Sequence, residues 1–474
     1  MTQAVAKRGL VERWRAFSPF TRAFAVFTFL VALVLPLALF AATGLRVSLM
    51  HVRILLLWKF NRDSWFVMDL ARDRLAQFPD QLIYNHIFVN EHNMFMYPLT
   101  SLLVYEPLKR LPSLGLNADF WANFVALALF LISVAIAAYL FVAYLTKYTD
   151  VLKSRDGTER LVVFALAAVL ALRYVPLIEA VDLGNIQSYL NGFFVIAFLF
   201  WLQGRKALAG VFVGLICVIK PALAIFLIWA VLRREWRFTA WFVGTGAVFL
   251  IGAVVAYGIP NNLDYMGVLS FVSERGAALF SNQTINGLLN RLMLNGPITR
   301  EEAWGGAQWG TGELFYYAPY NRLVHIGTLL SSAALMLAAL FWRWREHKRA
   351  PNIDFLIAGL SFVMASPLAW SHHYGGTIVM FAIAFPLAVA AKGMGRPWLI
   401  ALVVAFILMG ERFEVPDAWA RTPLNIFMSI GLFGAATLLC CLYKLRAVLA
   451  RSPVAAADAM APLARGPVPA ARAA

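Results

Sequence analysis

Apolar segments about as long as a bilayer is thick alternate with short polar segments along most of the chain. The first runs from 23 to 42 and the last from 424 to 443, and neither contains a charged residue. A helix needs about 20 apolar residues to cross the hydrocarbon core of a bilayer. The pattern therefore predicts an all-α polytopic membrane protein with about twelve transmembrane helices.

Composition indicates the same class of protein. Hydrophobic residues make up 61% of the 474 residues and charged residues 14%, whereas soluble domains have about 45–50% and about 25%. The net charge of +16 does not indicate nucleic acid, because the basic residues lie in short clusters between apolar segments rather than on one soluble face. We therefore expect the lipid bilayer as a partner and no nucleic acid.

The basic clusters predict how the chain crosses the membrane. Lysine and arginine gather before the first apolar segment and again near 147–160 and 343–349, and cytoplasmic segments carry such an excess. Both termini are therefore expected in the cytoplasm, with the first helix as an uncleaved anchor. This orientation leaves two large loops, at about 44–118 and 258–322, on the external face.

The chain divides into one membrane domain, 1–444, and a C-terminal tail, 445–474. The tail is rich in alanine, proline and arginine, and this composition predicts a disordered cytoplasmic segment. The three cysteines, Cys217, Cys440 and Cys441, fall inside predicted helices without paired or metal-ligand spacing. They predict neither a disulfide framework nor a metal site.

The first external loop carries candidate catalytic carboxylates. Asp63 precedes an apolar-spaced segment that predicts an interfacial helix, with Asp63 near its start. The alternative is that Asp63 only caps this helix, because aspartate accepts hydrogen bonds from exposed amides there. Asp69 and Asp73 share one face of the helix beside Arg72 and Arg74, which is typical of a solvated face.

Lys220 stands before Pro221 in an otherwise apolar segment between the basic pairs at 205–206 and 233–234. Proline ends one helix and can begin the next, so we expect a hairpin of two short helices with Lys220 at its external end. A charge at the bilayer centre costs about 2.5–3.5 kcal/mol, and its retention suggests a function, with a lipid phosphate as the natural partner. The alternative is that Lys220 merely snorkels to the headgroups.

A histidine pair and an arginine are further candidates for binding a phosphate at positions predicted to be external. His372 and His373 follow Trp370 at a helix junction and can donate to a phosphate or assist proton transfer. Metal ligation is the alternative, but adjacent histidines point apart and no third ligand is evident. We expect no metal cofactor, with a divalent ion left open. Arg291, in the second external loop, adds a cation that can bind phosphate bidentately.

Amide and aromatic side chains supply candidates for sugar or acceptor binding. Asn185 and Gln187 lie at the external end of a helix, and Asn282 lies in the second external loop. Amides recognise sugar hydroxyls, but they serve equally as helix caps. Tyr97 marks a proline-punctuated return to the membrane and can be purely structural, and Trp370 lies beside the histidine pair.

In order along nearly the whole chain, six pieces of sequence resemble the polyprenyl-phosphate-mannose-dependent mannosyltransferases of glycosyltransferase family 87. The pieces are Asp63 with Leu70-Ala-Arg-x-x-Leu75 and Tyr84, Tyr97-Pro98, Gly184-Asn-x-Gln187, Ala209-Gly210 through Ile219-Lys220-Pro221, Asn282-Gln283-Thr284 with Gly287 and Arg291, and Ser366-Pro367-x-x-Trp370-x-His372-His373. The chain departs from the family at Leu99, where a second proline is usual, and at Val67 to Asp69, where aromatic residues are usual.

The resemblance implies a membrane enzyme of the GT-C fold class in a bacterial inner membrane, with its active site on the external face. Such an enzyme transfers a hexose, mannose in this family, from a polyprenyl-phosphate sugar to a hydroxyl of a lipid-linked or cell-envelope glycan, with inversion. The role of general base carries over to Asp63, and the departure near Val67 leaves Asp69 as an alternative base. Chemically, a departing phosphate needs cations more than an acid, and Lys220, Arg291 and the histidine pair are candidates.

Two other functions remain as alternatives. A transporter or flippase of lipid-linked saccharides also needs a polar cavity, but no convincing inverted repeat is evident. An enzyme should cluster Asp63, Lys220 and His372 on one side of the membrane, whereas a transporter should spread its polar groups through the bilayer midplane. A ligase that moves a whole glycan shares the chemistry of the site.

Overall fold

The computed structural model describes residues 10–43, 50–111, 117–153, 155–304, 316–413 and 415–451. Within these residues the regular elements are helices. The α-helices are α1 (Leu10–Ala16), α2 (Pro19–Phe29), α3 (Leu35–Thr43), α4 (Asp63–Gln77), α5 (Thr100–Lys109), α6 (Ala118–Tyr148), α7 (Asp150–Lys153), α8 (Gly157–Arg173), α9 (Val175–Asp182), α10 (Gln187–Leu202), α11 (Lys206–Ile219), α12 (Phe226–Leu232), α13 (Trp236–Arg275), α14 (Ile285–Leu292), α15 (Arg300–Trp304), α16 (Arg322–Phe341), α17 (Pro351–Met364), α18 (Ile378–Ala390), α19 (Arg396–Gly410) and α20 (Ile430–Leu449).

Six helical segments of the described chain are long and apolar enough to cross a membrane. They are Pro19–Ala41, Ala118–Tyr148, Trp236–Arg275, Arg322–Phe341, Ser371–Ala390 and Pro423–Leu449. The bent pair α8 and α9, with 52° between them, makes a seventh span if it is counted as one. The structure thus confirms an all-helical membrane protein, but the predicted twelve spans are not confirmed, because other apolar segments form helices of only 10–17 residues.

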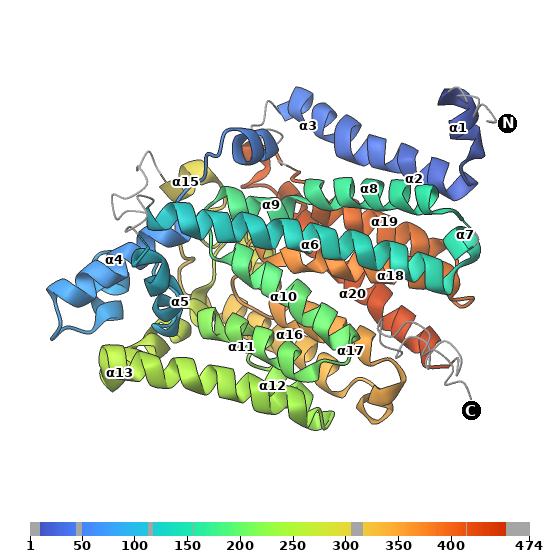
Figure 1. Cartoon of the computed structure of the whole chain (residues 1–474). Coiled ribbons are helices and arrows are strands. Elements are labelled where there is room, and N and C mark those ends of the chain that lie inside the picture. The colour runs from blue at the N-terminus through green and yellow to red at the C-terminus, as the bar shows by residue number, and fades with distance from the viewer. Residues whose placement is uncertain are drawn as a thin grey trace, which may run out of the picture.

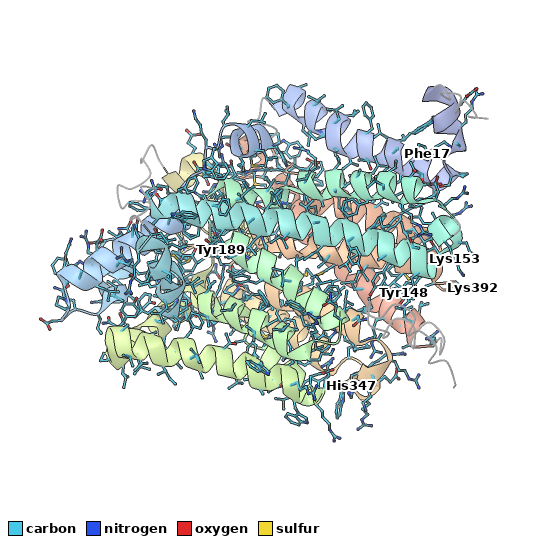
Figure 2. The ribbon with its side chains drawn as sticks, in the orientation of Figure 1. Phe17, Tyr148, Lys153, Tyr189, His347 and Lys392 are labelled. Carbon is cyan, nitrogen blue, oxygen red and sulfur yellow. The ribbon has the colours of Figure 1, made fainter. Side chains whose placement is uncertain are left out.

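The long helices run side by side as one bundle (Figure 1). The N-terminal helices α2 and α3 lie along one side of the bundle, and α13 lies along the opposite side. The helix α4 lies at one end, whereas α1 and the C-terminal part of α20 lie at the other. Figure 2 shows Lys153, His347 and Lys392 at the end away from α4. The helix α4 and these three basic residues therefore lie at opposite ends of the bundle.

Two breaks in apolar helices reflect residues that cannot continue a helix. As predicted, α11 ends at Ile219, Lys220 is extended (φ −149°, ψ 109°), and Pro221 begins a 3-10 turn. In α13, Gly258 takes a positive φ of 77° just before Pro260. The sequence predicted this helix to end at 257, but helical structure resumes and continues to Arg275. The first part of the segment predicted as the second external loop is therefore helical.

The core of the bundle contains a cluster of aromatic rings centred on Phe355 of α17. Its ring centroid lies 5.0 Å from those of Trp201 and Phe226 and 5.9 Å from that of Trp229. These ring contacts connect α10, α12 and α17. The last helix, α20, runs on to Leu449, past the predicted domain limit at 444, and residues 452–474 of the predicted tail lie outside the described residues.

Candidate functional site

The start of α4 docks on the turn between α9 and α10. Three backbone hydrogen bonds of 2.9–3.2 Å run from amides of residues 61–64 to carbonyl oxygens of residues 182–184. Gly184 has a φ of +61°, and a Cβ there would lie 1.9 Å from the carbonyl oxygen of Asn61. Only glycine permits this approach, so the Gly184 turn fixes where α4 begins.

Asp63 is the first residue of α4, as the sequence predicted. The capping alternative is not what the structure shows, because Arg62 is the N-cap and no side chain caps the helix. Instead, the Asp63 carboxylate accepts a short hydrogen bond from the Asn185 side-chain amide. Although Asp63 keeps some exposed surface, burial raises its pKa, while the Asn185 hydrogen bond and the charge of Lys220 lower it. A raised pKa makes the carboxylate a better proton acceptor.

Lys220 and His373 contact each other across 153 positions of the chain. The Lys220 Nζ lies 3.0 Å from the His373 Nε2, and the His373 Nδ1 accepts a hydrogen bond of 2.9 Å from the backbone N–H of Trp370. Both side chains line a cavity of about 60 Å³. Its polar wall also contains Gln187 and Asn191.

The rest of this cavity is mostly apolar. Its lining includes Leu190, Phe194, Leu223, Leu360 and Met380, from helices α10, α17 and α18 and the turn after Lys220. One cavity thus combines a lysine and a histidine with hydrocarbon walls. The lining therefore offers N–H donors beside apolar side chains, in a space of about 60 Å³ that admits only a small part of a ligand.

The predicted histidine pair separates in the structure. The rings of His372 and His373 are perpendicular, with centroids 4.7 Å apart, and only His373 lines the cavity. The backbone carbonyl of His372 accepts a hydrogen bond of 2.9 Å from Asn191, whereas its buried Nε2 has no hydrogen-bond partner among the described residues. The geometry therefore brings His373, and not His372, to Lys220.

The amides at 185 and 187 link the carboxylate to the cavity. The Asn185 Oδ1 accepts a hydrogen bond of 2.7 Å from the backbone N–H of Gln187. The Gln187 side chain donates to Asn191 at 3.2 Å and lines the cavity. These residues therefore join Asp63 to the wall that carries Lys220.

Two tyrosine side chains lie near the Asp63 carboxylate. The Tyr97 hydroxyl lies 2.8 Å from the Ser64 Oγ, and the Tyr316 ring packs perpendicular to the Trp370 ring at 5.5 Å. Burial and the charge of Asp63 raise the pKa of both Tyr97 and Tyr316, so both rings lie in the field of the carboxylate. Tyr316 was not among the predicted residues, because it follows a polar stretch without a matching motif.

Two predicted ligand residues contact a buried loop in the structure. Arg291 is fully buried, and its guanidinium donates to the carbonyl oxygens of Ala278, Leu279 and Asn282 and to the Ser429 hydroxyl. Asn282 is also fully buried, and its amide donates to two backbone carbonyls. Both side chains donate hydrogen bonds to the backbone carbonyl oxygens of a buried loop. The structure therefore does not place Arg291 or Asn282 beside Lys220.

Asp69 is held by cations rather than placed on a solvated face. Its carboxylate accepts hydrogen bonds from Arg62 at 3.0 Å and from the Tyr105 hydroxyl at 3.1 Å, and it forms an ion pair with Lys109 at 2.5 Å. Only 17% of its side chain is exposed. These partners occupy the lone pairs that a general base would need.

Metal ligation gains no geometric support. The part of the chain that the structure describes contains no group of three or more histidine, cysteine, aspartate or glutamate side chains that could hold a metal ion.

Comparisons with known proteins indicate a glycosyltransferase family. The family model described as "Glycosyltransferase family 87" matches residues 95–367. The matched region contains Lys220, whereas Asp63 precedes it and His373 follows it. No solved structure matches the chain.

One similar protein comes from Mycobacterium tuberculosis (strain ATCC 25618 / H37Rv). It is named polyprenol-phosphate-mannose-dependent alpha-(1-2)-phosphatidylinositol mannoside mannosyltransferase, and it is 29% identical over 170 residues, which are 35% of this chain and 33% of the relative. The chain therefore matches about a third of the length of this curated relative.

Proposed function

This chain belongs to glycosyltransferase family 87, and from this premise we propose that it transfers a hexose, mannose by analogy with its relative, from a polyprenyl-phosphate sugar to a hydroxyl of a lipid-linked or cell-envelope glycan. The observation that carries the proposal is a single site in which the Asp63 carboxylate lies in the field of Lys220. Lys220 in turn lines a largely apolar cavity with His373.

Asp63 acts as the general base in this proposal. Inverting transfer to a hydroxyl requires a group that takes the hydroxyl proton as the new glycosidic bond forms. Asp63 has the raised pKa and the neighbouring cavity that this role needs. Asp69 fits less well, because Arg62, Lys109 and Tyr105 already engage its oxygens.

The donor binds with its phosphate at Lys220 and His373. Their N–H groups stabilise the negative charge that develops as the phosphate leaves. Leu190, Phe194 and Met380 lie next to them and offer apolar contacts to the start of the prenyl chain, for which the cavity of about 60 Å³ must widen. Gln187 lines the same cavity and offers hydrogen bonds to sugar hydroxyls. Tyr97 and Asn185 lie beside the carboxylate, and Trp370 donates its backbone N–H to His373; these three residues contribute to the sugar and acceptor side.

The clustering of these groups favours an enzyme over a transporter. Asp63, Asn185, Lys220 and His373 form one connected site rather than a series along the bundle. Asp63 begins α4, which lies at the end of the molecule away from the basic residues Lys153 and Lys392 (Figures 1 and 2). This separation supports a multi-pass inner-membrane enzyme with cytoplasmic termini and an external site.

The test is transfer by purified protein in lipid nanodiscs, with a synthetic polyprenyl-phosphate mannose labelled in the sugar and a bacterial lipid extract as acceptor. We expect labelled glycolipid from the wild type and almost none from Asp63→Asn. Asp73→Asn is the matched control, because Asp73 lies on the same helix and is exposed; it should stay close to wild type. Labelled donor that crosses liposome membranes without forming product would contradict the proposal and favour a flippase.

A further inference from the structure

The hydrogen bonds of His373 determine which of its ring nitrogens carries hydrogen. Its Nδ1 accepts from the backbone N–H of Trp370 at 2.9 Å, which is the position of a side chain that caps the first turn of the 3-10 segment Ser371–Thr377. An accepting nitrogen carries no hydrogen, and a neutral imidazole has one N–H. The hydrogen of His373 is therefore on Nε2.

This tautomer constrains the state of Lys220. The Nε2–H of His373 points at the Lys220 Nζ over 3.0 Å, so the lysine nitrogen must accept a hydrogen bond. A charged ammonium has three donors and no lone pair, whereas a neutral amine can accept. Consistent with this geometry, burial lowers the pKa of Lys220 to about 7, while the charge of Asp63 opposes the shift.

Several elements contribute charged or polar groups near Lys220. Asp63 lies toward the start of α4, and His372 lies next to His373 on the same turn. The wall from α10 carries the uncharged amides of Gln187 and Asn191. Behind His372, Glu179 is paired with Arg412 at 2.9 Å. Asp63 is thus the carboxylate that competes with Lys220 for a proton.

We propose, resting on the function proposed above, that Lys220 is an uncharged amine before the donor binds, and that the donor binds together with one proton from solvent. The lysine amine takes up the proton and becomes an ammonium that donates to the phosphate. His373 then loses its acceptor, and its Nε2–H turns to the phosphate as well. The donor thereby replaces a lysine–histidine hydrogen bond with two contacts to its own anion.

A definite pH dependence follows from this coupling. The complex holds one proton more than the free protein, so donor affinity must fall as the pH rises above the pKa of the free lysine. Each pH unit above about 7 weakens binding by about tenfold. A lysine that is already charged before binding gives no such slope in this range.

The experiment uses a donor analogue that cannot react, a prenyl mannosyl phosphonate in which a methylene replaces the anomeric oxygen. Its phosphonate monoester is fully ionised at pH 8 and 9, so it does not itself exchange protons. Calorimetric titration of the full chain in nanodiscs at pH 8, in two buffers of different ionisation enthalpy, counts the protons taken up. Asp63→Asn is titrated in parallel, because it removes the competing carboxylate.

We expect uptake of about one proton by the wild type and by Asp63→Asn, and an affinity about tenfold weaker at pH 9 than at pH 8 in both. Binding without proton uptake by the wild type would overturn the inference while leaving the proposed function intact. Uptake that disappears in Asp63→Asn would assign the proton to the carboxylate and would also overturn it. Failure of the wild type to bind the analogue at all would contradict the proposed donor itself.

Discussion

Single residues set the acid–base behaviour of the proposed site. The structure separates two carboxylates that look alike in the sequence: Asp63 faces an amide and the field of one lysine, whereas Asp69 is engaged by two cations and a hydroxyl. A base needs a free lone pair and a pKa closer to the working pH. The difference between the two aspartates therefore comes from their neighbours.

Turnover should fall at low pH as Asp63 becomes protonated. Burial raises its pKa from 3.8, so the acid limb of the kcat profile should lie above the pH at which an exposed aspartate titrates. Activity is present above the pKa and lost below it, because the carboxylate must be ionised to take a proton. The profile should be measured with saturating donor, which removes the effect of donor binding; a kcat that stays flat down to pH 4 would contradict the assignment.

Replacing Lys220 with methionine should raise the KM for the lipid donor by at least tenfold and lower kcat less. Methionine fills a similar volume but cannot donate to a phosphate, and a charge-assisted hydrogen bond contributes about 1.5–3 kcal/mol. Initial rates over a range of donor concentrations separate the two parameters. Lys59→Met, at an exposed lysine before α4, is the matched control. Equal kinetics in the two variants would show that Lys220 only serves the fold.

The sequence could identify residue types but not their partners. Asp63 and Lys220 stood out because each is a charge in an unusual context, and the structure brings both into one site. Arg291, as a loop cation, and Asn282, as a loop amide, also looked like ligand residues, yet both donate to backbone carbonyl oxygens of a buried loop. A polar residue gives the same sequence signal whether it faces a ligand or a backbone carbonyl, because the signal contains no long-range contact.

At the scale of elements, the site depends on how closely α4 approaches the α9–α10 turn. Gly184→Ala should lower transfer at least tenfold, because its Cβ would meet the Asn61 carbonyl oxygen at 1.9 Å and push the start of α4 away. Gly204→Ala is the matched control, since Gly204 also has a positive φ, +73°, but nothing lies within 4 Å of its Cβ. The control should lose about 1 kcal/mol of stability and keep its activity.

Activity and thermal unfolding should be measured on both glycine variants in the same detergent. Wild-type transfer by a folded Gly184→Ala protein would show that the approach of α4 is not needed for catalysis. A loss of activity in Gly204→Ala as large as that in Gly184→Ala would assign the effect to general backbone strain.

A buried carboxylate attaches the N-terminal span to the bundle. Glu159 of α8 accepts hydrogen bonds from the Ser18 backbone N–H at 2.9 Å and from the Thr21 hydroxyl at 2.6 Å. Glu159→Ala leaves both donors without a partner, which should cost about 1–3 kcal/mol of stability, whereas Glu159→Gln keeps an acceptor and should cost less. Thermal unfolding of the two variants checks this order, and equal midpoints would contradict it.

Helix lengths were predicted less well than helix positions. The break at Lys220 was predictable because proline cannot donate to the preceding turn. The continuation of α13 beyond Gly258 was not, because glycine and proline also mark loops. Apolar length likewise predicted spans where the structure has short helices, since a buried helix needs apolar residues whether or not it crosses the bilayer.

At the scale of the whole molecule, the proposed topology can be tested by labelling single cysteines in intact spheroplasts. After Cys217, Cys440 and Cys441 are replaced by alanine, Asn90→Cys should react with a membrane-impermeant maleimide from outside. Lys153→Cys should react only after permeabilisation, because basic segments stay in the cytoplasm. Both positions are exposed in the structure. The reverse pattern would invert the orientation and place the site on the cytoplasmic face.

The contacts that build the site can form only in the order in which their residues are translated. Asp63 and Asn185 are separated by 122 positions, so a ribosome adding about 5–20 residues per second needs roughly 6 to 24 s between them. Asp63 is translated first, and it can dock only after the α9–α10 turn has been made. Another 153 positions separate Lys220 from His373, so their contact forms later still. A nascent chain stalled before the turn from 371 to 377 therefore already has its carboxylate seated, but its lysine has not yet met its histidine partner.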